Sequence, residues 1–283
     1  MNISKTLFFA LLAGVLAITA FAQTPQPLKR TITKTDRFDF GAGGTVSITG
    51  APNGSIRVTS TAKNEIEITA EIELQAASEA ELNQLAAVTG FVTEESVART
   101  GIVSVGTNNR LGDKKQWKKF PKDLIGLPFR IDYVISVPRY CDLEINGGKG
   151  DLSVVGVDGS MRIDFLETNA RIETGGGNTM ATIGSGTVDV AMGVHGWRGR
   201  SATIQVGKGT LNVRLPSNMS AEIDAVILRT GSIENLFPDL KPRDRKVVFT
   251  DKSIIAKAGV GGVALKFTVG DGTLKMERLV LPL

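Results

Sequence analysis

The sequence is poor in the residues that build covalent cross-links and many catalytic sites. It has 283 residues but only one cysteine, Cys141, and one histidine, His195. A single cysteine excludes an intramolecular disulfide framework, and because no thiol-activating motif surrounds Cys141 we expect a partly buried, inert thiol. No nucleophile motif such as G-x-S-x-G accompanies His195, and one histidine with one cysteine makes a poor zinc site. We therefore interpret His195, beside Trp197, as a loop-packing residue.

Long apolar runs are also missing, with one exception at the N-terminus. Residues 1–5 are short and basic, residues 7–18 are apolar, and Ala20-Phe21-Ala22 is an A-x-A cleavage signal. This three-part pattern predicts a secretory signal peptide over residues 1–22, cleaved between Ala22 and Gln23. The run is too short to span a bilayer, which needs about 20 apolar residues. We expect an exported protein, periplasmic, extracellular or on the cell surface, with no transmembrane segment in the mature chain.

Apolar and polar residues alternate through most of the remaining chain. The alternation is longest in residues 65–74, and it predicts strands with one buried face and one solvated face. The pattern divides the chain into a flexible tether (23–35), an N-terminal β-rich segment (36–138) and a β-strand repeat (139–283). We expect residues 36–283 to form one continuous domain.

One segment has helical periodicity instead. Ser78 and Glu81 stand at the positions of a capping box, and Leu82, Leu85 and Ala86 form an i, i+3, i+4 apolar stripe. The sequence predicts a helix over about residues 78–88 that packs on the sheet or covers its end. A helix that binds a partner is the alternative.

A Gly-Ser/Thr-apolar step recurs through the chain. Its copies begin at Gly44, Gly54, Gly159, Gly186, Gly209, Gly231 and Gly272. Because glycine adopts φ > 0 without steric cost, each copy is interpreted as a corner before a strand, with a structural Ser or Thr. The spacing of the strands gives a rung of roughly 18–20 residues. This favours an all-β fold, a β-solenoid or β-helix-like stack of short strands. Copies from 159 to 233 are assigned to the stack, and those at 44, 54 and 272 to flanking hairpins or end rungs.

The segments that carry this pattern resemble a known bacterial family. An alternating strand that ends in Val-Pro, Ile131-Asp132-Tyr133-Val134-Ile135-Ser136-Val137-Pro138, is followed by Gly150-Asp151-Leu152-Ser153-Val154, Gly159-Ser160-Met161-Arg162-Ile163 and Gly186-Thr187-Val188-Asp189-Val190. This order is similar to that of the bacterial putative-adhesin family of β-strand repeats, a domain of unknown function. The resemblance covers about residues 36–283. It implies a stacked β fold and an adhesin-like role, and it transfers no catalytic residue. The alternation breaks over residues 194–200, where we expect a rung to bulge.

The glycine clusters do not complete a ligand-binding motif. Residues 147–151 are similar to a calcium-binding nonapeptide, but the aspartate falls one position early and no tandem copies follow. Residues 174–178 lack the lysine and the helix of a phosphate loop. We assign no catalytic residue, metal or cofactor.

Three carboxylates leave an enzyme open as the alternative. Asp164, Glu173 and Asp189 stand at outward positions of the alternation. If two of them align across rungs, they could cleave a glycan as acid and base. Such rows are ordinary surface charges in most solenoids, so the preferred interpretation is non-enzymatic.

Residues 108–130 carry the strongest local charge. Seven basic and two acidic residues give this segment a net charge of +5, against +4 for the whole chain. A basic loop that also holds aromatic side chains is typical of a site for anionic polysaccharide, lipid headgroups or the acidic patch of another protein. A solvated insertion is the alternative. The candidate polyanion-binding residues are Arg110, Lys114, Lys115, Trp117, Lys118, Lys119, Phe120 and Lys122.

These features together predict an exported, non-enzymatic β-repeat protein of the bacterial cell envelope that acts as an adhesin-like binding or structural module. Its expected partner is anionic polysaccharide or another envelope protein, and export disfavours nucleic acid. The competing hypothesis is an enzyme that acts on envelope polysaccharide with outward carboxylates.

Overall fold

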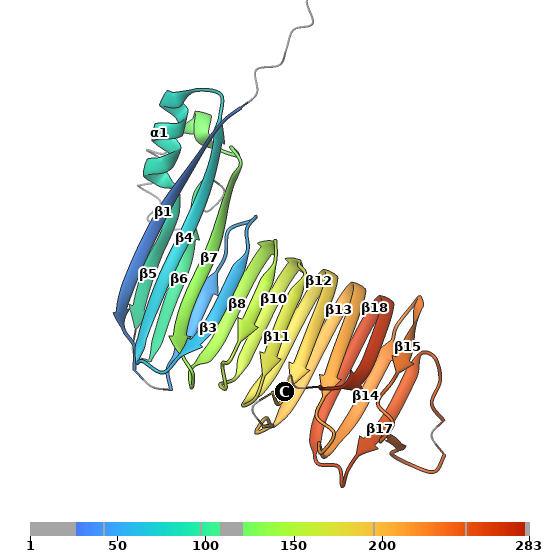
Figure 1. Cartoon of the computed structure of the whole chain (residues 1–283). Helices are drawn as coiled ribbons and strands as arrows, with labels where there is room; N and C mark the ends of the chain where they lie inside the picture. Colours follow the sequence, from blue (N-terminus) through green and yellow to red (C-terminus); the bar gives the residue numbers. More distant parts are fainter. Residues whose placement is uncertain are drawn as a thin grey trace, which may run out of the picture.

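The computed structural model describes residues 27–41, 43–96, 98–107, 121–194, 196–246 and 248–280. These residues form an all-β fold with one short α-helix, as predicted. The strands make a mixed sheet in which parallel pairs dominate the middle and antiparallel pairs lie at the ends (Figure 1). None of the described helices is long and apolar enough to cross a membrane.

The N-terminal segment and the repeat both consist mainly of strands. The N-terminal strands are β1 (Leu28–Asp39), β2 (Thr45–Thr49), β3 (Ile56–Thr61), β4 (Glu65–Ala76), β5 (Gly90–Ser96), β6 (Arg99–Val105) and β7 (Phe129–Pro138). The next are β8 (Asp142–Lys149), β9 (Leu152–Val155), β10 (Met161–Glu167), β11 (Ala170–Thr174), β12 (Asn178–Met192) and β13 (Ser201–Leu215). The last are β14 (Ala221–Ile227), β15 (Gly231–Asn235), β16 (Lys241–Pro242), β17 (Ser253–Ala258) and β18 (Val263–Arg278).

The strands stack as two parallel ladders. The first ladder runs β6, β2, β8, β10, then the first halves of β12, β13 and β18, and then β14. The second ladder runs β7, β3, β9, β11, then the second halves of β12, β13 and β18, and then β15. Antiparallel strands extend the ends: β4 and β1 follow β7, β5 follows β6, and β17 and β16 follow β14.

The register of the middle strands has a fixed offset. Leu143 pairs with Met161 and Met161 with Thr179, so the chain advances by the same length at each of these rungs. This length agrees with the predicted rung of roughly 18–20 residues. Between β12 and β13 the offset is longer, because Asn178 pairs with Ser201. The extra residues fall in 193–200, the segment where the broken alternation predicted a bulge.

Two parts of the array are out of chain order. β2 and β3 lie between β6/β7 and β8/β9, and β18 lies between β13 and the pair β14/β15. The copies at Gly54 and Gly272 therefore stand inside the second ladder, in line with Gly186, Gly209 and Gly231, so their assignment to flanking hairpins or end rungs is wrong. Chain order misled the prediction because these rungs are completed by segments far apart in the sequence.

The hydrophobic core lies between the two ladders. Alternate side chains of both ladders are fully buried and belong to one cluster; among them are Ile163, Ile183, Ile204 and Phe267 of the first ladder and Ile172, Val190, Val213 and Met276 of the second. Burial of each such side chain stabilises the fold by about 1.5–3 kcal/mol. The remaining alternate residues form the outer face of each ladder.

The predicted helix is present as α1 (Glu79–Val88). The Ser78 side chain accepts a hydrogen bond from the Glu81 N–H at 3.3 Å, and Glu81 accepts one from the Ala77 N–H at 2.9 Å. Leu82 and Leu85 are buried, as the stripe predicted. In Figure 1 the helix lies at one end of β1 and β4, beside the short 3-10 helix η1 (Lys122–Leu124).

Two boundaries of the N-terminal segment differ from the prediction. Residues 28–35, expected in the flexible tether, belong to β1, which pairs with β4 over its whole length. The Thr- and Lys-rich composition hid this strand because only Ile32 and Phe38 mark its inner face. The basic loop also ends before residue 130, since β7 begins at Phe129.

Candidate binding surface

The second ladder carries a continuous row of polar side chains on its outer face, which we call the polar ladder. Each member directly precedes the first apolar residue of its strand, and these apolar residues pair in register from β3 to β15. The polar ladder consists of Ser55, Asp151, Asn169, Thr187, Thr210, Thr273 and Ser232. Because adjacent strands lie about 4.8 Å apart, hydroxyl, amide and carboxylate groups repeat at that interval.

A column of glycines shapes the corner in front of the polar ladder. Gly186, Gly209 and Gly272 have φ of 131°, 134° and 138°, which side chains rarely adopt. A Cβ on any of them would stand within 1.9 Å of a carbonyl oxygen in the neighbouring rung. Glycine is therefore required twice over, by the backbone angle and by the close approach of the next rung. Of the seven sequence copies, those at Gly44 and Gly159 begin strands of the first ladder instead.

Two open depressions adjoin the polar ladder where it crosses β9, β11 and β12. One has a volume of about 240 Å³ and lies at the corner, and the other has about 480 Å³ and lies on the outer face. Asp151 and Asn169 line both depressions, so the two are adjacent. Their shape suits an extended ligand that lies across rungs better than a small molecule enclosed in a pocket.

Charges of both signs surround these depressions. Lys149 forms an ion pair with Glu167 at 3.0 Å, and Arg171 stands beside Asp189 on the next strand. Asn169 donates a hydrogen bond to Asp151 at 3.4 Å. The side chains offer donors and acceptors to a polar ligand, and exposed Arg171 offers a charge to an anionic group.

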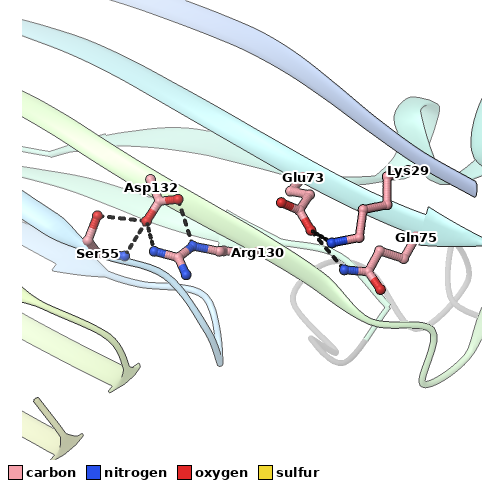
Figure 2. A network of polar contacts seen from close by, with 6 residues as sticks. All are labelled: Lys29, Ser55, Glu73, Gln75, Arg130 and Asp132. Atoms are coloured by element: carbon pink, nitrogen blue, oxygen red, sulfur yellow. Dashed lines mark hydrogen bonds and ion pairs between the residues drawn. The ribbon is translucent and has the colours of Figure 1, made fainter.

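A carboxylate lies at the β3 end of the polar ladder. Figure 2 shows Asp132 of β7, which accepts hydrogen bonds from the Ser55 N–H at 2.7 Å and hydroxyl at 2.6 Å and from Arg130 at 2.7 and 2.9 Å. Burial opposes ionisation of Asp132, but these donors together outweigh it and lower its pKa. Nearby, Glu73 accepts hydrogen bonds from Gln75 and Lys29, which lower the pKa of Glu73 (Figure 2).

The three predicted carboxylates do not form a row. Asp164 lies on the first ladder, whereas Glu173 and Asp189 lie on the second, on the other outer face. Glu173 pairs with Ala191 across the rungs, and Arg171 donates a hydrogen bond to it at 2.8 Å. Asp189 accepts one from Asn212 at 3.0 Å. Asp164 is therefore separated from the other two, whereas Glu173 and Asp189 lie on adjacent strands of one outer face, two residues out of register.

Most of the predicted polyanion-binding residues lie outside the described residues. These are Arg110, Lys114, Lys115, Trp117, Lys118, Lys119 and Phe120. Lys122 is described and begins η1. Since η1 contacts α1, the described chain resumes after the loop at the end of the sheet that carries α1. Arg130, counted in the loop, is a residue of β7 that pairs with Asp132. The predicted cleavage site, Ala22 and Gln23, also lies outside the described part.

The two other predicted packing residues that the structure describes, Cys141 and Trp197, lie in or against the core. Cys141 is fully buried, and burial raises the pKa of its thiol to about 12, which fits the inert thiol expected. Trp197 is partly buried against the core. His195 lies outside the described residues. Among the residues that the structure describes, no group of three or more His, Cys, Asp or Glu is placed to hold a metal ion.

The polar ladder was missed as a surface because its register is not visible in the sequence. The Gly-Ser/Thr-apolar step signalled five of its members, but Asp151 and Asn169 lie in strands where the step is altered or missing. Only the pairing of strands that are distant in the chain places Ser55 and Thr273 in the same row. The glycine step was the signal, and strand order was the missing information.

No family model and no curated protein match this chain. Among solved structures, it is similar to a putative cell adhesion protein from Clostridium sporogenes, with 12% identity, 88% of this chain and 100% of that chain covered, and a TM-score of 0.45. It is also similar to a putative adhesin from Bacteroides fragilis, with 11% identity, 90% and 99% covered, and a TM-score of 0.28. A putative adhesin from Parabacteroides merdae matches with 8% identity, 86% and 95% covered, and a TM-score of 0.26.

Proposed function

We propose that this chain is an exported, non-enzymatic β-solenoid of the bacterial cell envelope that binds an anionic polysaccharide along its polar ladder. The observation that carries the proposal is the row of seven in-register polar side chains with two adjacent depressions beside it. A linear polymer of hydroxyl-bearing units can repeat its contacts from rung to rung, so weak individual hydrogen bonds add up over the length of the row.

The solenoid part of the proposal rests on the register. From β8 and β9 to β12 both ladders keep one constant offset, which is what successive coils of one repeat produce. Each of β12, β13 and β18 contributes to both sides. The fold then serves as a rigid rod whose outer faces repeat at the strand spacing. Rigidity favours binding because little side-chain and backbone freedom is lost when the ligand docks.

The anionic character of the ligand rests on the cations near the row. Arg57 and Arg171 are exposed and stand on either side of Ser153, in the row next to the polar ladder. The sequence adds the basic loop, whose +5 charge would raise the local concentration of a polyanion. The predicted signal peptide supports the proposal, because an exported chain would meet envelope polysaccharide.

Removal of two polar-ladder side chains and of the neighbouring Arg171 tests the binding surface. In the purified chain, Asn169→Ala, Arg171→Ala and Thr187→Ala together remove exposed groups from the two depressions. We expect at least about tenfold weaker retention on immobilised envelope polysaccharide, because several hydrogen bonds of about 1 kcal/mol each are lost.

A matched control uses the other outer face of the same rungs. Arg162, Asp164 and Thr182 are outward residues of β10 and β12 on the first ladder, and their replacement by Ala should leave binding unchanged. Equal loss in both triple variants, or none in either, would contradict the polar ladder as the binding surface.

The basic loop is tested separately on a simple polyanion. Replacement of Lys114, Lys115, Lys118 and Lys119 by Ser should lower the salt concentration that elutes the chain from heparin resin, because four charges are removed. Unchanged elution would remove the loop from the proposal and leave the polar ladder.

A turnover assay on the immobilised envelope polysaccharide of the binding test addresses the enzyme alternative. Product formation that is lost in Asp189→Asn or Glu173→Gln would overturn the non-enzymatic proposal.

A further inference from the structure

One long edge of the array has no partner strand among the described residues. β1 pairs with β4 over residues Leu28↔Ala76 to Asp39↔Glu65 and with no other described strand. At the far end of the same ladder the edge is the five-residue strand β15, and the first ladder ends in the seven-residue strand β5 and in the two-residue strand β16, which contains Pro242. β1 carries charged side chains, which are one way to blunt an edge, but it is the longest of these edge strands, has no proline and has a continuous register.

The backbone of β1 directs alternate N–H and C=O groups to the open side. The Arg37 N–H donates to its neighbour's side chain, Asp36 Oδ1, at 2.9 Å rather than to β4. In an antiparallel pair the N–H and C=O of one residue point the same way, and the direction alternates along the strand. Thr31, Thr33, Thr35 and Arg37 therefore present their backbone groups to the open side.

We infer that β1 pairs antiparallel with β1 of a second copy of this chain, with Thr35 opposite Thr35 on a two-fold axis. In this register Lys34 faces Asp36 of the second copy and Ile32 faces its Phe38, and each pair occurs twice. Thr33 faces Arg37 and Thr31 faces Asp39 in the same way. Opposite charges and apolar pairs across strands stabilise a sheet, and like charges destabilise it.

The charges of β1 exclude the neighbouring registers. A two-fold axis at Ile32 opposes Arg30 to Lys34, and an axis at Thr33 opposes Lys29 to Arg37. An axis at Lys34, Asp36 or Arg37 places that residue opposite its own copy. Among two-fold axes placed at residues 32 to 37, only the axis at Thr35 brings no like charges opposite each other. A strand edge that allows one self-pairing and penalises its neighbours has the pattern of a specific dimer contact.

The inward side chains of β1 are compatible with the pairing. Lys34 donates a hydrogen bond to the Thr89 carbonyl at 2.8 Å at the end of α1, and its ammonium keeps two further N–H donors for Asp36 of the second copy. Asp36 is released from the Arg37 N–H when that N–H binds the carbonyl of Thr33 in the second copy. The new contact joins the two sheets edge to edge and removes the open edge from both copies.

Site-specific cross-linking of the purified chain tests the register. Cys141 is fully buried, so Thr35→Cys introduces a single accessible thiol, and a mild oxidant such as diamide should join two copies through it. Thr31→Cys on the same strand and the same face is the matched control, because Thr31 faces Asp39 of the second copy and not itself. We expect a covalent dimer from Thr35→Cys only. Cross-linking of Thr33→Cys instead, or equal yields from Thr31→Cys, would overturn the register.

A charge variant tests the dimer without cross-linking. Thr33→Arg places an arginine opposite Arg37 of the second copy, and this repulsive pair occurs twice in the dimer. Within its own sheet position 33 lies beside Glu71, which accommodates the new cation. Sedimentation equilibrium should show a dissociation constant raised about tenfold, and circular dichroism should show an intact fold. A wild-type chain that remains monomeric over the whole concentration series, with no cross-linking of Thr35→Cys, would overturn the inference.

Discussion

At the residue scale, the same arrangement closes corners at both ends of the array. Asp271 accepts hydrogen bonds from Arg229 at 2.9 and 2.5 Å and from the Thr230 hydroxyl at 2.8 Å, much as Asp132 accepts them from Arg130 and Ser55. In both cases an aspartate accepts hydrogen bonds from an arginine and from a hydroxyl side chain, and the residue with the hydroxyl belongs to a neighbouring rung. The carboxylate thereby holds two rungs together at a corner where regular strand pairing is interrupted.

These contacts predict a loss of stability in acid. Hydrogen bonds from Arg229 and Thr230 lower the pKa of Asp271 from 3.8 to about 2, and the pKa of Asp132 is lowered as well. A lowered pKa in the folded state stabilises the fold above the ordinary pKa, and this contribution disappears as the pH falls through the folded value. We expect Asp271→Asn to lower the urea midpoint near neutral pH and to match the wild type near pH 2. A difference that is constant with pH would contradict this role.

Cys141 predicts a thiol that reports on global unfolding. Burial raises its pKa to about 12, so the reactive thiolate is scarce at mildly alkaline pH and the sulfur is covered in any case. A colorimetric thiol reagent should not react with the folded chain on the time scale of mixing, and it should react with one thiol per chain in denaturant. Fast reaction in the folded state would show that the Cys141 corner opens locally.

At the element scale, the corner glycines should differ in importance by a measurable amount. Gly209→Ala meets both a φ of 134° and a carbonyl oxygen 1.9 Å from the new Cβ. Gly196→Ala meets only the positive φ of 95°, and Gly41→Ala meets neither obstacle. We expect losses in the free energy of unfolding of more than about 3 kcal/mol, about 1 kcal/mol and close to zero, in that order. Urea denaturation of the three variants checks the order, and a mild effect of Gly209→Ala would contradict the requirement for glycine.

How far the sequence predicts these elements depends on how local the signal is. The strict alternation in 65–74 and the capping box at Ser78 are local patterns, and both predicted their elements correctly. β1 was missed because charged residues occupy half of its inward positions, which is a property of an edge strand and not of a buried one. The polar ladder and the place of β18 depend on pairings between residues far apart in the chain, which a local pattern does not record.

At the scale of the whole molecule, the out-of-order rungs make the array more cooperative than a simple repeat. In a linear repeat each unit contacts only its chain neighbours, and the end units can unfold separately. Here β18, the last strand of the chain, lies between β13 and β14, and β2 lies between β6 and β8. Unfolding of either terminal segment therefore removes an interior rung, which favours a single unfolding transition.

Removal of one complete coil tests the repeat architecture. Deletion of residues 161–178 removes β10 and β11 and brings Thr179 to the place of Met161, next to Leu143. The deleted segment is as long as the offset between Met161 and its partner Thr179, so both ladders keep their register. We expect a folded β protein that melts in one transition at a lower temperature.

Deletion of half a coil is the matched control. Loss of residues 161–169 leaves Ala170 to follow the corner after β9, so the chain enters the first ladder with a strand that belongs to the second. Every later strand is then displaced to the wrong side, and we expect aggregation or loss of the β signal in circular dichroism. If both deletions fold equally well, or both fail, the rungs are not interchangeable coils of one fixed length. The rod that is proposed to present the polar ladder would then have to be abandoned, whatever the binding assays show.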